Sequence, residues 1–256
     1  MGVDRSADDA RPGAIDTRGS AGADVPVIPD ARELRPHPDT PALPRETRDR
    51  ATYYADLKAG VQAEYRAHAI DQGCERVRET EETIVTPAML RIEAADPGRR
   101  LAGLEFRLKG KDRIEEKVSK AMAERGRTAD QAFAEIKDAI RYTFQYPDDK
   151  YSQGVRADIE RLKQAGFELA EFRNTWTDPE YKGINSRWRV PQNGQLFEVQ
   201  FHTQASFEAK QVTHSAYERL RVLPEDHDEV YNLRAYQREV TAKIPVPREA
   251  AEVSVP

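Results

Sequence analysis

Four cationic side chains are spaced so that they could surround a phosphate group: Arg107, Lys109, Arg113 and Lys117. Arg107 and Lys109 alternate along a predicted strand, so both would point to one face of a sheet. Lys117 lies one turn after Arg113 on the helix predicted next, within reach of the same edge. Cations that converge in this way neutralise a polyphosphate and the charge that develops during its transfer. The alternative interpretation is a solvated basic helix face.

Two carboxylates occur where this helical region meets the next predicted strand. Glu135 and Asp138 lie just before Arg141, in the alternating segment AIRYTFQY over residues 139–146. A carboxylate at a strand edge suits Mg²⁺, because this ion is bound by one or two carboxylates together with phosphate oxygens. A charge cluster that merely ends a helix is the alternative.

A third group of polar side chains follows a strand pattern. Glu198, Gln200 and His202 share one face of a predicted strand, and apolar residues alternate with them on the other face. A row formed by an acid, an amide and an imidazole is costly to bury without partners, so this face lines either water or a site. Glu198 is a candidate for holding a metal or for accepting a proton from an attacking hydroxyl. An ordinary amphipathic strand with a wet face is the alternative.

A turn-rich segment before that strand carries Tyr181 and Asn185. Tyr181 is a candidate for stacking on a nucleobase, and Asn185 for positioning a phosphate or ribose, although a single tyrosine more often serves packing. His202 and His214 have no third ligand nearby, which argues against a zinc site. Cys74 is interpreted as a buried apolar residue rather than a nucleophile. The sequence contains neither a P-loop nor a G-x-G-x-x-G turn.

Hydrophobic periodicity predicts the elements that must position these residues. A helix begins near Thr47 and stops at Gly73, and Pro87 argues against one unbroken helix through residues 75–95. The predicted strands, of which the last two form a hairpin at Asn193-Gly194, cover residues 101–109, 139–146, 167–176, 184–190 and 195–203. The later helices cover residues 112–125, 129–137 with Thr128 as N-cap, 151–165, 205–221 and 226–241. This order predicts an α+β fold in which helices flank a mixed sheet.

Composition divides the chain into segments. The first 48 residues hold seven of the sixteen prolines and no aromatic residue. Residues 1–45 are therefore predicted to be a disordered leader or linker. Residues 46–100 are expected to form a helical extension, residues 101–223 the domain that carries the candidate site residues, and residues 224–256 a C-terminal helix with a loose tail.

Charge and hydropathy exclude several classes of protein. A net charge of −5 and a pI near 5.7 leave no global basic field for nucleic acid, although a local basic patch is compatible with them. No apolar run approaches the roughly 20 residues that a membrane span needs. No apolar core follows a basic start at the N-terminus, so no Sec-type signal peptide is expected and the predicted location is cytoplasmic. Export by a route without a cleavable signal is the alternative. A single cysteine excludes a disulfide framework.

Taken in this order, the segments over residues 101–221 resemble the synthetase domain of the RelA/SpoT family. Members of that family are nucleotidyltransferase-like enzymes that move pyrophosphate from ATP to a nucleotide 3′-hydroxyl. The first family motif has the form R-x-K-x-x-x-S-I-x-x-K and reads RLKGKDRIEEK here, with Arg113 in place of the serine. The resemblance implies that Arg107, Lys109 and Lys117 bind the ATP phosphates.

The second family motif has an aspartate five residues before an arginine that leads into a strand. Here the arginine is Arg141, position 136 is Ile136, and the nearest carboxylate is Asp138, with Glu135 in reserve. The resemblance implies that Arg141 binds ATP and that Asp138 reaches the metal through a shorter loop or belongs to an altered metal site.

The third family motif, N-G-Y-x-S-[IL]-H, reads EYKGIN here, so Tyr181 keeps the base-stacking position while Gly183 replaces a serine and Asn185 a histidine. In the family this region holds the acceptor nucleotide. The changes therefore indicate an acceptor other than the usual guanosine nucleotide. The fourth motif, E-[IV]-Q-I-R-T, reads EVQFHT and implies that Glu198 is both catalytic and a metal ligand. The acceptor-binding residues implied by the resemblance are Tyr181, Asn185, Gln200 and His202.

The resemblance thus implies a Mg²⁺-dependent nucleotide 3′-pyrophosphokinase with Glu198 and Asp138 as its catalytic residues. Its substrates would be ATP and an acceptor nucleotide, and its products AMP and an alarmone-type nucleotide. Two alternatives stay open. One is a toxin-like relative that modifies an RNA 3′ end, and the other is a degenerate, non-catalytic nucleotide-binding module, which the displaced aspartate and the altered motif positions favour.

Overall fold

The computed structural model of the protein describes residues 50–255. The predicted leader over residues 1–45 lies outside these residues. The chain divides into two units, residues 1–61 and residues 62–256. The described part of the first unit belongs to helix α1 (Arg50–Thr80).

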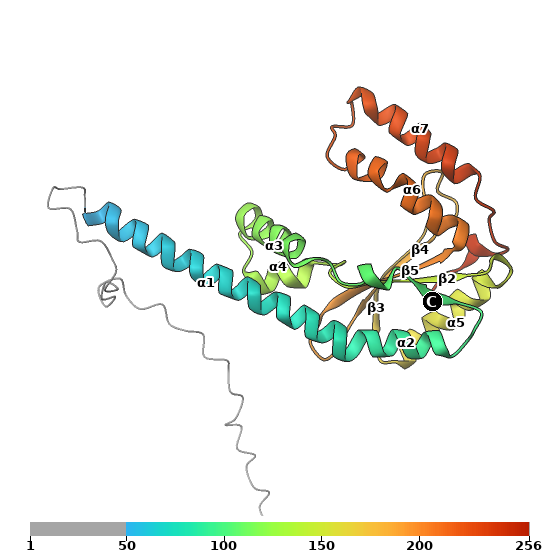
Figure 1. The fold of residues 1–256 in the computed structure, drawn as a ribbon, viewed down its shortest axis with the longest axis horizontal. Coiled ribbons are helices and arrows are strands. Elements are labelled where there is room, and N and C mark those ends of the chain that lie inside the picture. The colour runs from blue at the N-terminus through green and yellow to red at the C-terminus, as the bar shows by residue number, and fades with distance from the viewer. Residues whose placement is uncertain (1–49, 256) are drawn as a thin grey trace, which may run out of the picture. The chain divides into compact units, whose positions relative to one another are not determined.

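A five-stranded mixed sheet in the order β1-β2-β5-β4-β3 forms the framework of the second unit (Figure 1). Strands β2 and β5 are parallel, and the other neighbours are antiparallel. The strands are β1 (Arg100–Ala102), β2 (Arg141–Tyr146), β3 (Glu168–Asn174), β4 (Ile184–Arg189) and β5 (Leu196–Thr203). The predicted α+β class with a mixed sheet is confirmed.

The helices follow the predicted order closely. After α1 they are α2 (Thr86–Ala94), α3 (Lys111–Arg125), α4 (Ala129–Glu135), α5 (Tyr151–Gln164), α6 (Gln204–Leu220) and α7 (Asp228–Ala242). Thr128 forms a capping box with Gln131 at the start of α4, as its position predicts. Gly126 ends α3 in the left-handed conformation, which glycine adopts without a steric penalty.

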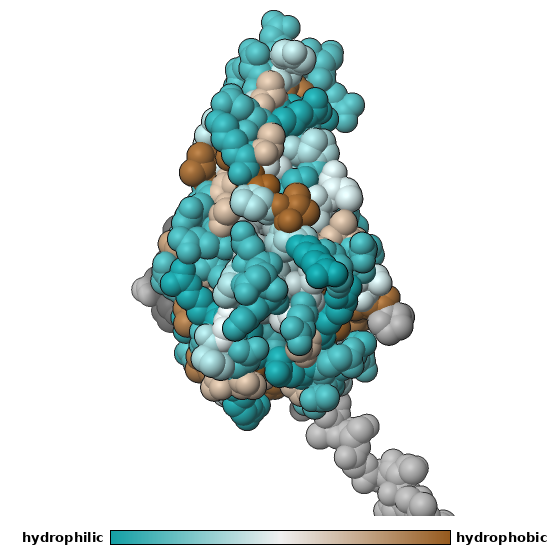
Figure 2. Space-filling view, turned by 90° about the vertical axis from the view of Figure 1, so that its right-hand side faces the viewer, coloured by the Kyte–Doolittle hydropathy of each residue, from teal (hydrophilic) through white to brown (hydrophobic). Residues whose placement is uncertain are grey.

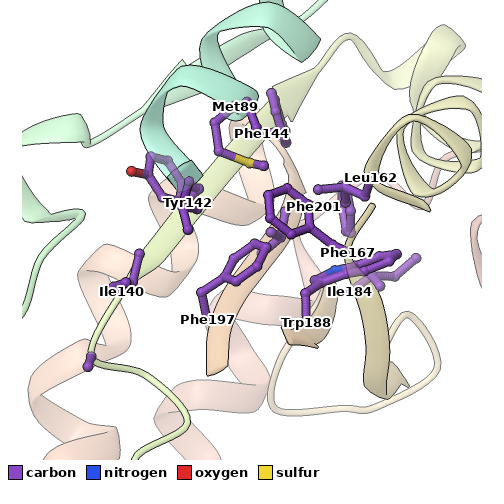
Figure 3. Close-up of a cluster of buried hydrophobic side chains, with 14 of the residues drawn as sticks. Met89, Ile140, Tyr142, Phe144, Leu162, Phe167, Ile184, Trp188, Phe197 and Phe201 are labelled. Carbon is purple, nitrogen blue, oxygen red and sulfur yellow. The ribbon is translucent and has the colours of Figure 1, made fainter. Parts of the chain in front are cut away.

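Helices α2 and α5 cover the apolar face of the sheet. Figure 3 shows Met89 of α2 beside Phe144 of β2, and Leu162 of α5 near Phe201 of β5. Phe144 and Phe201 are fully buried and their rings stack at a centroid distance of 6.3 Å. Strand β5 lies between β2 and β4, so its aromatic residues form the middle of the core.

The sequence predicts that the first helix stops at Gly73. Helix α1 instead continues through this residue to Thr80. A Cβ atom at Gly73 would lie 2.0 Å from Cε2 of Phe133 on α4. Glycine therefore serves close packing between two helices here, and not termination. The helical path changes at a π-helical turn over Glu81–Val85 instead. Pro87 falls in the first turn of α2, directly after this π-helical turn.

We expect Gly73→Ala to lower the free energy of unfolding by about 2 kcal/mol, because the added methyl group overlaps the Phe133 ring. Gly60 lies in the same helix and has open space where a Cβ atom would be added, which makes Gly60→Ala the matched control. That change should be neutral or stabilise by up to about 1 kcal/mol through helix propensity. Denaturant unfolding of both variants checks this, and equal effects at the two glycines would contradict it.

The strand predicted over residues 101–109 is wrong beyond Ala102. Gly103 is left-handed, with φ of 64°, and turns the chain into a 3₁₀ segment over Leu104–Phe106. Phe106, which an unbroken strand would point to the core, is 73% exposed. A single bridge between Leu108 and Ile140 then returns the chain to the edge of β2.

The prediction of a loose C-terminal tail is also wrong for the described residues. Ala250 and Val253 are buried, and a short 3₁₀ segment spans Ala250–Glu252. Asn174 at the end of β3 donates from Nδ2 to the carbonyl oxygens of both residues, at 2.8 and 3.0 Å. Ser152 on α5 donates to the carbonyl of Arg248. The tail therefore covers one end of the sheet.

Hydrophilic residues predominate on the face of the molecule shown in Figure 2, and hydrophobic residues are exposed there only in small separate groups. Scattered exposed apolar residues are ordinary for a protein surface. Between residues 50 and 255, none of the helices combines the length and the apolar character that crossing a membrane requires.

Candidate functional site

The second face of the sheet carries polar side chains in register across its three central strands. Arg141 on β2 and Arg187 on β4 both lie directly opposite Glu198 on β5. In the next polar row, Thr143 lies opposite Gln200. Because directly paired residues point to the same face, Glu198 is flanked on both sides by arginines.

The polar row of β5 is buried, since Glu198, Gln200 and His202 are each no more than 6% exposed. It is therefore not the wet face of an amphipathic strand. Buried polar groups need hydrogen-bond partners. Other elements supply these partners, which are Arg141 for Glu198, Lys210 for Gln200, and Tyr181 and Ser206 for His202.

Asp138 is the point at which three of the predicted cations meet. Its Oδ1 atom accepts from Nζ of Lys117 at 2.7 Å. Its Oδ2 atom lies 3.0 Å from Nζ of Lys109 and 3.3 Å from Nη2 of Arg141. The Arg141 guanidinium also donates from Nε to Oε2 of Glu198 at 2.5 Å. One guanidinium thus bridges two carboxylates.

The Asp138 cluster, formed by Asp138, Lys109, Lys117 and Arg141, is brought together by separate segments of the chain. Lys117 comes from α3, while Arg141 opens β2. Lys109 is held beside the start of β2, because its backbone N–H donates to the carbonyl of Ala139 at 2.9 Å. Lys117 is 40% exposed and Arg141 36%, so the cluster is accessible from solvent.

The charges of the cluster perturb one another strongly. Burial opposes ionisation of Asp138, but hydrogen bonds from Lys117 and Lys109 outweigh it and bring the pKa of Asp138 down to about 2. Burial also lowers the pKa of Lys109, against the effect of Asp138. Three cations face the two carboxylates, so the cluster carries a net positive charge that suits an anionic ligand.

Arg107 does not join the Asp138 cluster in this structure. Its Nε atom contacts Oε1 of Glu81 at 2.7 Å, and Tyr142 donates to the same oxygen at 3.0 Å. Glu81 is only 1% exposed and comes from the π-helical turn. A contact between Arg107 and ATP phosphates, which the resemblance implies, would compete with this ion pair and stays a prediction.

Glu135, the alternative carboxylate, and Arg113, which replaces the motif serine, also lie outside the Asp138 cluster. Glu135 pairs with Arg125 at 2.9 Å and with Arg127 at 2.7 Å. Arg113 is largely exposed and pairs with Glu116 on its own helix. The geometry therefore favours Asp138 over Glu135 as the site carboxylate.

Tyr181, His202 and Ser206 form a chain of hydrogen bonds in which His202 and Ser206 are buried and Tyr181 is half-buried. The Tyr181 hydroxyl donates to Oδ1 of Asn185 at 3.2 Å and lies 2.9 Å from Nε2 of His202. Nδ1 of His202 lies 2.9 Å from Oγ of Ser206. Burial, together with the Lys210 cation, holds the pKa of His202 well below its usual range, so the imidazole is neutral. The imidazole therefore positions Tyr181 and offers no positive charge to a phosphate.

The segment before β4 is shaped around this histidine. Gly183 has a φ of 153°, and a Cβ atom there would lie 2.6 Å from Cε1 of His202. This close approach explains why a glycine occupies the position that is a serine in the family motif. Helix α7 fixes the same segment, since Arg238 pairs with Glu180 at 2.8 Å and Thr241 donates to its carbonyl.

Two cations of the polar face are missing from the sequence-based prediction. Arg187 is in register with Glu198, and its alternation with Asn185 was a usable signal for that position. Lys210 reaches Gln200 from α6. No local pattern marks Lys210, because the face that α6 turns toward the sheet depends on tertiary packing. Cys74 and His214 contribute no polar contact to the site in the described region.

The donor set for a metal is small. Within residues 50–255, no group of three or more His, Cys, Asp or Glu side chains is placed to hold an ion. Asp138 and Glu198, bridged by Arg141, remain as two carboxylates on the polar side of the sheet. This pair fits Mg²⁺, which uses one or two carboxylates and completes its shell with water and substrate phosphate. It does not fit a metal held by protein ligands alone.

The sequence matches no family model and no curated protein. Among solved structures, it is similar to small alarmone synthetase 2 from Bacillus subtilis, with a TM-score of 0.46 and 12% identity over 67% of this chain and 90% of that one. It is also similar to a GTP pyrophosphokinase family protein from Streptococcus pneumoniae, with a TM-score of 0.41 and 16% identity over 73% and 89% of the two chains. A third similar structure is small alarmone synthetase 1 from Bacillus subtilis bound to its product pppGpp, with a TM-score of 0.39 and 14% identity over 71% and 90%.

Proposed function

We propose that this chain transfers pyrophosphate from ATP to the 3′-hydroxyl of a nucleotide, the activity that its motifs imply. The observation that carries the proposal is the Asp138 cluster. Lys109, Lys117 and Arg141 come from separate elements and converge beside Glu198. Converging cations next to a carboxylate suit phosphoryl-group transfer, in which the protein mainly positions reactants and neutralises charge.

Binding of ATP would exchange the partners of these cations. In the structure Asp138 satisfies Lys109, Lys117 and Arg141. A polyphosphate offers more oxygens and more charge than one carboxylate, so the three cations turn to it and Asp138 is released. Asp138 and Glu198 are then the residues that would hold Mg²⁺, which supplies charge neutralisation at the phosphates when bound.

The acceptor is expected on the Tyr181 side of Glu198. Tyr181 would stack on the base, with Asn185, Gln200 and His202 around it. The acceptor 3′-oxygen attacks the β-phosphorus of ATP, and the bond from that phosphorus to the α,β-bridging oxygen breaks, so AMP leaves. Glu198 accepts the proton of the 3′-hydroxyl as the new bond forms.

A non-catalytic nucleotide-binding module is the second candidate, and one observation favours it. Arg141 engages both carboxylates at once, at 2.5 Å for Glu198 and 3.3 Å for Asp138. If this bridge persisted in the nucleotide complex, neither carboxylate would be available for a metal or a proton. Such a protein would bind ATP without turning it over.

The test is transfer of label from γ-labelled ATP in the presence of Mg²⁺, with GDP, GTP, ADP, ATP and bulk tRNA each offered as acceptor. The proposal predicts a labelled nucleotide that carries a 3′-pyrophosphate. Label on tRNA instead would identify the RNA-modifying alternative. ATP binding with no transfer to any acceptor would contradict the proposal and support the binding module.

A further inference from the structure

Lys210 is a cation at the site that forms no direct ion pair among residues 50–255. It extends from α6 over the polar face, where its Nζ atom donates to Oε1 of Gln200. The same atom lies 5.4 Å from the centroid of the Phe207 ring. No carboxylate of the described part of the chain is within ion-pair distance of it. Lys109, Lys117 and Arg141 differ in this respect, because Asp138 pairs with all three.

This arrangement is unfavourable for the protein alone. An ammonium group has three N–H donors, and one amide oxygen and one ring face leave part of that capacity unused. Burial, and secondarily the Arg141 cation, lower the pKa of Lys210 to about 8 against the opposing effect of the Glu198 carboxylate, so the group is still mostly protonated at neutral pH. A partly buried cation without a direct ion-pair partner costs stability, which a bound anion would restore.

Lys210 also lies away from the point at which the other cations converge. Its partner Gln200 follows Glu198 by two residues on β5, a shift of about 7 Å along the strand and toward the acceptor residues. Asn185 lies opposite Gln200 on β4. The Asp138 cluster lies at the other side of Glu198, around the start of β2. Two positive regions thus flank one carboxylate.

We propose that Lys210 binds a phosphate group of the acceptor. The inference rests on the proposed function, in which the Asp138 cluster takes the ATP phosphates. A single ammonium group beside an amide suits one phosphate, as a point charge with an orienting hydrogen-bond partner. The phosphate can belong to a free nucleotide or to an RNA end, and the experiment distinguishes these sources.

The test compares Lys210→Met with Lys243→Met in the full chain. Lys243 is an exposed lysine of the C-terminal region that pairs with Glu239, so it is the matched control. With GDP, ADP and bulk tRNA as separate acceptors, we expect Lys210→Met to raise the KM of the accepted substrate at least tenfold and that of ATP less than twofold. Lys210→Arg, which keeps the charge, should recover most of the loss. The acceptor that loses affinity identifies the source of the phosphate.

A structural role for Lys210 would give a different pattern. Equal rises in both KM values, no recovery with Lys210→Arg, or an unchanged acceptor KM would each overturn the proposal. Thermal unfolding of each variant is recorded alongside, and Lys210→Gln replaces Lys210→Met if the latter does not fold. If the wild-type protein transfers no pyrophosphate, the proposed function fails. Equilibrium binding then decides about Lys210: selective loss of GDP or ADP binding in Lys210→Met, with ATP binding kept, supports its role, and unchanged binding or no binding by the wild type overturns it.

Discussion

Replacing Glu198 with glutamine is expected to lower the rate of AMP release by about 10³-fold, the effect of removing a general base that also helps to hold a metal. Glutamine has nearly the same shape and keeps an oxygen that can accept from Nε of Arg141. It cannot take the proton of the acceptor hydroxyl. Steady-state rates of AMP formation from ATP, measured with the accepted nucleotide, check this prediction.

The control for Glu198→Gln is Glu168→Gln, an exposed carboxylate on β3 of the same sheet. This control should leave the rate unchanged, which would exclude a general effect of lost negative charge. Thermal unfolding and ATP binding should differ little between Glu198→Gln and the wild-type protein, because Arg141 keeps Asp138 as a counter-ion. A Glu198→Gln enzyme that turns over within threefold of wild type would remove Glu198 from the chemistry.

Replacing Asp138 with asparagine is expected to have opposite effects on ATP binding and on turnover. Without Mg²⁺, ATP should bind about tenfold more tightly, equivalent to about 1.4 kcal/mol, because no carboxylate competes with the phosphates for the cations. With Mg²⁺, turnover should fall at least about 10²-fold, because the ion loses a ligand. Calorimetric titration with ATP, in chelator and in Mg²⁺, and the transfer assay measure both effects.

Glu135→Gln is the matched control for Asp138→Asn. Glu135 lies three residues upstream and pairs with Arg125 and Arg127, outside the Asp138 cluster. The Glu135→Gln variant should therefore bind ATP and turn it over as the wild-type protein does. Weaker ATP binding to Asp138→Asn without Mg²⁺ would show that the three cations do not exchange Asp138 for phosphate. A larger effect from Glu135→Gln would show that Glu135, and not Asp138, is the carboxylate of the site.

The pH dependence of the Asp138 effect has a definite sign. The pKa of Asp138 is lowered to about 2 in the folded protein, from about 3.9 in an unfolded chain. The stabilisation from its ion pairs is therefore fully present above about pH 4 and is lost as the pH falls through about 2. Between pH 5 and 8 Asp138 stays ionised, so its own titration should add no pH dependence to the difference in ATP affinity between Asp138→Asn and wild type in that range.

Much of the fold follows from local sequence signals. Alternation predicted β2 and β5, the Asn193-Gly194 turn predicted β4 as the hairpin partner of β5, and Thr128 capped α4 where expected. These elements carry strong periodicity or turn chemistry of their own. The prediction at Gly73 was wrong because a glycine in a helical pattern usually indicates where the helix ends. Here the glycine leaves room for the Phe133 ring of another helix, where a Cβ atom would otherwise lie. Such packing cannot be deduced from a single segment.

The candidate site was predictable to a similar extent. The convergence of Lys109 and Lys117 near Asp138 followed from a helix that returns to a strand edge. The position of Arg107 did not follow, because the left-handed Gly103 breaks the expected strand and a distant residue, Glu81, pairs with its guanidinium. The contact of Lys210 with the site could not be predicted without knowing how α6 packs on the sheet. Long-range packing, and not residue type, thus limited the prediction.

The most direct test of pyrophosphoryl transfer is the identity and stoichiometry of the nucleotide that ATP becomes. Purified protein, α-labelled ATP, Mg²⁺ and the accepted nucleotide are incubated, and the labelled product is separated from its precursor. We predict labelled AMP, formed in equal amount to the 3′-pyrophosphorylated acceptor and reduced about 10³-fold by Glu198→Gln. Labelled ADP as the main product would mean transfer or hydrolysis of a single phosphoryl group, and would contradict the proposed reaction.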